Sequence, residues 1–80
     1  MALQIYSVAI EMIRLLRPLL ERIDTRDKNL GDQLRRAATS VPLNLNEGAY
    51  SNGRNVRARY FNALGSAAEV RACLDVAEAL

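Results

Sequence analysis

The chain has 80 residues, half of them hydrophobic, and a formal net charge of +2, so it has room for one small domain with a modest core. It contains no histidine and a single cysteine, Cys73. This composition excludes an internal disulfide and the usual histidine-based zinc and catalytic sites, and we expect no metal, cofactor or small-molecule substrate. No apolar run approaches the roughly 18 residues of a membrane span, and the N-terminus lacks the features of a secretory signal. We therefore expect a cytoplasmic protein that does not bind membranes.

The first predicted helix covers residues 3–24. Apolar residues repeat there with gaps of three and four, the spacing of a helix that packs at a shallow angle in a bundle: Tyr6, Ala9, Ile13, Leu16, Leu20 and Ile23. A second apolar set widens this stripe beyond what one neighbouring helix covers, so we expect a second contact: Ile5, Val8, Met12, Leu15 and Leu19. Pro18 lies inside the pattern and predicts a bend near residues 14–17.

The second predicted helix covers residues 30–49 and follows a polar turn at 24–29, in which Asp27 or Asn29 is the expected N-cap. Its core face consists of Leu34, Ala37, Ala38, Val41, Leu45 and Gly48. Pro42 inside a helix costs about 3 kcal/mol. Because the apolar spacing continues through Pro42 without a change of phase, we predict that Pro42 kinks the helix. The alternative, in which Pro42 ends one helix and begins the next, stays open.

The third predicted helix covers residues 56–80, with Asn55 as the expected N-cap. Its core stripe is Tyr60, Ala63, Ala67, Val70, Leu74 and Ala77. A second face carries mainly small residues: Phe61, Gly65, Ala68, Ala72 and Val76. The pattern reaches Leu80 without a stop signal, which fits a trimmed C-terminus, further residues in the natural protein, or a partner's helix in the missing place. Three helices in one domain, residues 1–80, predict an all-α up-and-down bundle.

Polar residues of the second helix form the first candidate site. Arg36, Ser40, Asn44 and Glu47 share one side of this helix, and Glu69 of the third helix can join them. One interpretation is a small binding site. The other, which we favour, is a structural hydrogen-bonded network in which Ser40 or a water meets carbonyls released by Pro42, and Glu47 or Glu69 pairs with Arg36. Nothing in this set resembles a nucleophile with its base, so we expect no enzyme activity.

Arginines form the second candidate site, a surface for nucleic acid: Arg35, Arg36, Arg54, Arg57 and Arg59. Between positions 35 and 59 these five face a single acidic residue, Glu47, so the local field is positive although the chain is nearly neutral. Phosphate contacts require arginine or lysine side chains that cluster in space. Each arginine alone fits equally well in an ion pair with an acid of a neighbouring helix.

Two stretches carry a resemblance to a known family: QLRRAATSVPLNLNEG at 33–48 and GRNVRARYFNALGSAAEV at 53–70. They resemble the four-helix-bundle proteins encoded in intervening sequences of bacterial 23S ribosomal RNA genes, whose pattern is QLRRA-x-x-S-[IV]-P-x-N-[IL]-x-E-G followed by L-x-x-A-x-G-S-x-x-E. The first pattern matches throughout. The second matches at Leu64, Gly65, Ser66 and Glu69, but the chain spaces its leucine and glycine more closely.

The resemblance implies a fourth helix, an oligomeric habit and a loose association with RNA, but no reaction. It extends in fold to the accessory protein of diversity-generating retroelements, a basic pentameric bundle. We therefore predict a non-enzymatic, self-associating bundle, a pentamer as first guess, that binds RNA or DNA. The alternative is a purely structural oligomerisation module that contacts a protein partner. Five residues are the expected contacts between copies: Leu43, Phe61, Gly65, Ala68 and Ala72.

Overall fold

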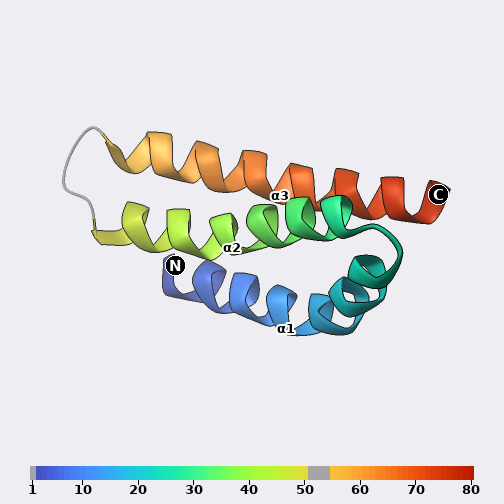
Figure 1. Cartoon of the computed structure of the whole chain (residues 1–80). Helices are drawn as coiled ribbons and strands as arrows, with labels where there is room; N and C mark the ends of the chain where they lie inside the picture. Colours follow the sequence, from blue (N-terminus) through green and yellow to red (C-terminus); the bar gives the residue numbers. More distant parts are fainter. Residues whose placement is uncertain (1, 51–54) are drawn as a thin grey trace.

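The computed structural model describes residues 2–50 and 55–80, and these ranges are helical apart from single residues at Asp27 and Leu80. Helix α1 spans Ala2–Arg26, α2 spans Lys28–Tyr50 and α3 spans Asn55–Ala79. Successive helices run antiparallel, and α2 lies between α1 and α3 (Figure 1). The all-helical class predicted from the sequence is confirmed, while a fourth helix remains an expectation.

The turn between α1 and α2 is shorter than the sequence pattern indicates. Only Asp27 separates the two helices, whereas we expected a polar turn at 24–29. The backbone amide of Asp27 donates to the carbonyl of Ile23 at 2.7 Å, so the last turn of α1 is completed. Asp27 Oδ1 accepts from the amide of Leu30 at 3.1 Å. Of the two residues proposed as N-cap, Asp27 therefore caps α2.

Replacing Asp27 by alanine should lower the free energy of unfolding by about 1 kcal/mol, because the amide of Leu30 loses its side-chain acceptor. Urea denaturation followed by circular dichroism measures the loss. Asn29→Ala is the control, since Asn29 is exposed and lies inside the first turn of α2. Equal effects of the two substitutions would contradict the assignment of Asp27 as the cap.

Two clusters of buried side chains hold the three helices together, and each cluster takes residues from all three. The larger one contains Leu16, Leu30, Leu34, Ala37, Ala38, Val70 and Cys73. The smaller one contains Ala9, Val41, Leu45 and Ala63. All six predicted core positions of α2 are buried. Among the described residues, α2 supplies most of the buried ones, because α2 packs against both α1 and α3.

Both prolines lie inside continuous helices. Helix α1 runs through Pro18, and α2 runs through Pro42, which is buried. The prediction that Pro42 does not end the second helix is confirmed, and the alternative of a new helix beginning at Pro42 is wrong. The kinks at both positions stay predictions.

Helices α1 and α3 expose apolar side chains that α2 does not cover. On α1 these are Ile5, Val8, Leu15 and Leu19, and on α3 they are Phe61, Leu64 and Val76. Tyr60, which we expected in the core, is half-exposed, although its ring lies against Gly48 of α2. Uncovered apolar surface of this extent usually marks a contact with another molecule or segment. None of the described helices is long and apolar enough to cross a lipid bilayer.

Candidate nucleic-acid interface and polar groove

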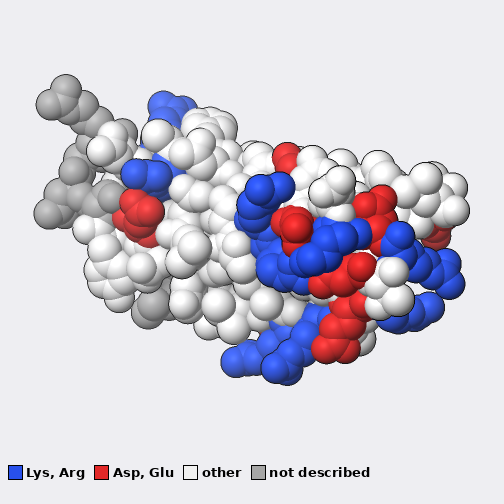
Figure 2. All heavy atoms as spheres, in the orientation of Figure 1, with Lys and Arg blue, Asp and Glu red and all other residues white. Residues whose placement is uncertain are grey.

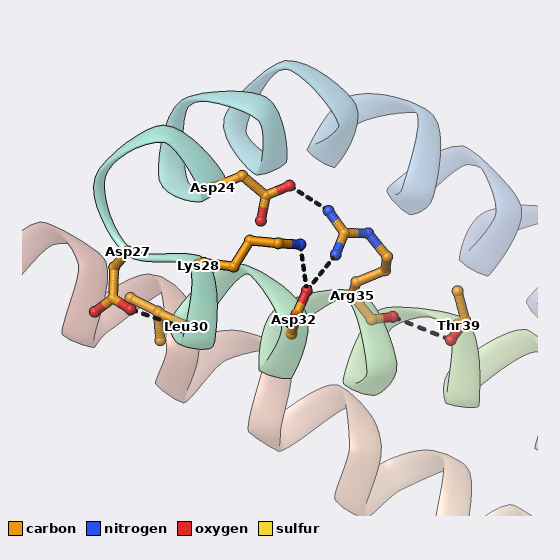
Figure 3. A network of polar contacts seen from close by, with 7 residues as sticks. All are labelled: Asp24, Asp27, Lys28, Leu30, Asp32, Arg35 and Thr39. Carbon is orange, nitrogen blue, oxygen red and sulfur yellow. Dashed lines mark hydrogen bonds and ion pairs between the residues drawn. The ribbon is translucent and has the colours of Figure 1, made fainter.

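Arg35 lies at the α1–α2 turn, held between two carboxylates (Figure 3). Its Nη2 pairs with Asp24 Oδ2 of α1, and its Nη1 pairs with Asp32 Oδ1 at 2.9 Å. Lys28 Nζ bonds the same Asp32 oxygen at 3.1 Å. The hydrogen bond from Lys28, helped by the charges of Lys28 and Arg35, lowers the pKa of the Asp32 carboxyl, and the Asp24 partner raises the pKa of Arg35. Arg35 thus has its charge matched within the fold.

Of the other predicted arginines, Arg36 directly follows Arg35 on α2, whereas Arg57 and Arg59 lie at the start of α3. Arg36, one position further and so about 100° around α2, is exposed, and no ion pair joins it to the described part of the chain. Arg57 is exposed, and its Cζ lies 5.9 Å from the centroid of the Phe61 ring. Arg59 Nη2 pairs with Glu47 Oε2 at 3.1 Å. Arg54 lies outside the described residues. The structure therefore separates Arg35 and Arg36 from the arginines near the start of α3, because Ser40 already lies opposite Ser66 and Gly48 opposite Tyr60.

Charged side chains are unevenly spread on the face shown in Figure 2. A large group of mixed sign covers the half that carries the α1–α2 turn, and a smaller group lies at the other end, next to the residues that are not described. The surface between them is mostly uncharged. Ion pairs occur at both ends: Asp24 and Asp32 engage Arg35 and Lys28 near the turn, and Glu47 engages Arg59 at the other end.

The predicted polar network is centred on Ser40 and includes a residue that the periodicity of α2 did not reveal. Asn44 Nδ2 donates to both the carbonyl and the hydroxyl oxygen of Ser40, each at 2.9 Å. The Ser66 hydroxyl of α3 donates to Ser40 Oγ at 2.8 Å. Glu47 pairs with Arg59 rather than with Arg36, and Glu69 is exposed. Ser66 could have been found from the second family motif, in which it follows Gly65.

A groove of about 510 Å³ runs between α2 and α3 beside this network. Its polar lining consists of Ser40, Asn44, Arg59, Asn62, Ser66 and Glu69, and the ring of Phe61 borders it. The hydroxyls and amides supply both donors and acceptors, while the carboxylate of Glu69 supplies acceptors alone. Such a lining can orient a polar ligand through several hydrogen bonds at once.

Two further observations concern the thiol and the acidic side chains of the described residues. Cys73, the single thiol of the chain, is buried in the core, and its burial, followed by the charge of Glu69, raises the pKa of the thiol. A thiol in that state is a poor nucleophile. Within residues 2–50 and 55–80, no three histidine, cysteine or acidic side chains gather as metal ligands would.

The fold and the groove together define a small all-helical protein with a polar inter-helix site. A family model described as 23S rRNA-intervening sequence protein matches residues 1–80. The chain therefore belongs to the 23S rRNA-intervening sequence protein family, and the resemblance seen in its motifs is confirmed. Searches of curated proteins and of solved structures found no match.

Proposed function

We propose that the protein is a non-enzymatic, self-associating helical bundle that binds nucleic acid, RNA before DNA, through the arginines of α2 and of the start of α3. The observation that carries this proposal is the state of Arg36 and Arg57. Both are exposed, and neither forms an ion pair with a described residue. The acids of the α1–α2 turn are engaged by Arg35 and Lys28. Arg36 and Arg57 therefore keep their full charge for phosphate.

The arginine content and the family support RNA as the first ligand to test. Ten of the eleven basic residues are arginine, whose planar guanidinium can meet two phosphate oxygens at once. The family is named for intervening sequences of 23S rRNA. Self-association would strengthen binding, because each copy adds its own arginines to one strand.

Charge reversal tests the proposal. In Arg36→Glu combined with Arg57→Glu, we expect RNA affinity at low salt to fall at least about tenfold, and the slope of log affinity against log salt to fall by about two, one unit for each lost phosphate contact. The helical circular dichroism signal should not change, because both side chains are exposed. Fluorescence anisotropy with labelled RNA over a salt series gives both quantities.

The control is Arg22→Glu combined with Arg26→Glu. It changes the net charge equally at two exposed positions of α1, the helix that lies on the other side of α2 from α3 (Figure 1). If this control and the test variant lose the same affinity, a general charge effect explains the result and the proposed surface is wrong.

A structural oligomerisation module is the second candidate, favoured by the exposed apolar faces. Val8 and Leu15 on α1 and Leu64 on α3 are more than half exposed, and so is Leu43 on α2. A fourth helix would cover one face, and another copy would cover the other. A closed ring of identical head-to-tail contacts needs two different complementary surfaces, and a ring of five copies is the assembly we propose.

Leu43→Arg should weaken this assembly and leave the fold stable, because the Leu43 side chain is exposed on α2. Multi-angle light scattering of the natural full-length protein at tens of micromolar should show a lower mass for the variant, while its unfolding midpoint stays within experimental error of the parent. Gln33→Arg, a matched charge at another exposed position of α2, should keep the parent mass. A monomeric parent protein would refute the ring.

A further inference from the structure

The groove between α2 and α3 has the size of a ligand site, and it is open and mainly polar. Its volume of about 510 Å³ lies within the range of roughly 300–1,000 Å³ typical of small-ligand sites. Ser40 and Asn44 line it from α2, and Asn62, Ser66 and Glu69 line it from α3. Phosphate-binding arginines alone do not require such a groove.

Hydrogen bonds within the protein hold several polar side chains of the groove in place, and other donors and acceptors there have no bond to a described residue. Bonds to Ser40 from Asn44 and Ser66 fix these three side chains. Within the described residues, no hydrogen bond engages Asn44 Oδ1 or the side-chain amide of Asn62. Because the amide nitrogen of Asn44 already donates twice to Ser40, Asn44 offers its Oδ1 acceptor alone, whereas the carboxamide of Asn62 presents a donor and an acceptor side by side. This pattern complements the Watson–Crick edge of a base that is not paired.

Phe61 supplies the second feature of a base site. Its side chain is 61% exposed and borders the groove, and the guanidinium of Arg57 lies 5.9 Å from its ring. Surfaces that bind single strands combine an exposed aromatic ring, on which a base stacks, with a nearby cation for the backbone. Glu69 inside the groove repels phosphate, so a nucleotide would place its base in the groove and its phosphate outside, at Arg57.

We propose that the α2–α3 groove binds an unpaired base of a single-stranded nucleic acid, stacked on Phe61 and hydrogen-bonded by Asn44 and Asn62. This inference rests on the proposed nucleic-acid binding and adds the form of the ligand, a single strand instead of a duplex. Bases inside a duplex are stacked and paired and cannot enter the groove without being extruded. Phe61 then serves the nucleic acid and not the contact between copies, while Ala68 and Ala72 remain for assembly.

Fluorescence anisotropy of the full chain tests the proposal with a labelled RNA of about a dozen nucleotides that cannot pair with itself, and with the same strand in a duplex. We expect tighter binding of the single strand. Phe61→Ala should lower single-strand affinity about tenfold and leave duplex affinity unchanged, and Phe61→Trp should restore the preference. Leu64→Ala is the matched control, because Leu64 is 66% exposed on the same helix and lies outside the groove.

The outcomes separate this inference from the proposed function. Equal affinity for the single strand and the duplex, with no effect of Phe61→Ala, would refute base binding in the groove and leave nucleic-acid binding by the arginines intact. Absence of binding to either RNA form would refute both proposals. If Phe61→Ala also lowers the mass measured by light scattering, Phe61 could act through the groove or through a contact between copies, and the Asn62→Ala variant distinguishes these two explanations. Loss of the single-strand preference in Asn62→Ala supports the groove, and an unchanged preference overturns it in favour of a contact between copies.

Discussion

Leu34→Ala should lower the free energy of unfolding by about 3 kcal/mol, within the range of roughly 2–5 kcal/mol for buried leucines. Leu34 is fully buried, with 0% of its surface exposed, and it belongs to the larger core cluster, which joins all three helices. The alanine would leave a cavity in this cluster, and the loss of stability includes the cost of that cavity. Because a chain of this length is stable by roughly 4–12 kcal/mol in total, the loss is a large part of the whole.

Urea denaturation followed by circular dichroism at 222 nm measures this change in the free energy of unfolding. The curves of parent and variant are fitted together with one shared slope of free energy against urea concentration. Leu43→Ala is the control: the same substitution on the same helix, at a side chain that is 63% exposed, should change the free energy of unfolding of the monomer by less than about 0.5 kcal/mol. Similar losses at the two positions would show that the core does not lie where the structure places it.

The core of α2 was predictable because this helix has one wide apolar face. Its buried positions follow a single helical period from Leu30 to Gly48. That period shows which face of α2 is buried even when the neighbouring helices are unknown. The same period correctly indicated that α2 continues through Pro42. A local rule about proline was outweighed by burial along the whole helix.

Helix α3 was harder to predict because apolar residues surround it. Its core stripe included Tyr60, which is half-exposed, and omitted Cys73, which is buried. When large and small apolar residues occupy most sides, periodicity alone cannot tell which side meets a neighbour. The choice depends on how α2 and α3 cross, and the sequence of α3 does not contain that information.

The candidate sites show the same division between local and tertiary information. The sequence pattern placed Ser40 and Asn44 on one side of α2, and a hydrogen bond joins their side chains in the structure. The sequence pattern could not reveal the ion pair of Asp24 with Arg35 across the turn, or that of Glu47 with Arg59 between α2 and α3. Charges that are far apart in the chain attract only when the fold brings them within a few ångströms, so these partners follow from the packing of the helices.

Gly31→Ala should destabilise the fold, although alanine is the better helix former by about 1 kcal/mol. Gly31 is buried under the last turn of α1, and an added Cβ would overlap Asp24 Oδ1 and lie 2.9 Å from Asp24 Cγ and 3.3 Å from Asp24 Cα. The Asp24 carboxylate would have to leave Arg35, and the two helices would have to move apart. Overpacking of this kind costs about 1–3 kcal/mol, so we expect a net loss of about 1–2 kcal/mol.

Gly65→Ala is the opposite case on α3, because nothing lies within 4 Å of an added Cβ there. Without a clash, the higher helix propensity of alanine should raise the free energy of unfolding by about 0.5–1 kcal/mol. A double-mutant cycle of Gly31→Ala with Asp24→Ala then assigns the cause. If the Asp24 side chain is the obstacle, Gly31→Ala should cost clearly less in the Asp24→Ala background. An unchanged cost would place the obstacle in the backbone of α1 and would mean that the distance between α1 and α2, and not the Arg35 ion pair, requires a glycine at position 31.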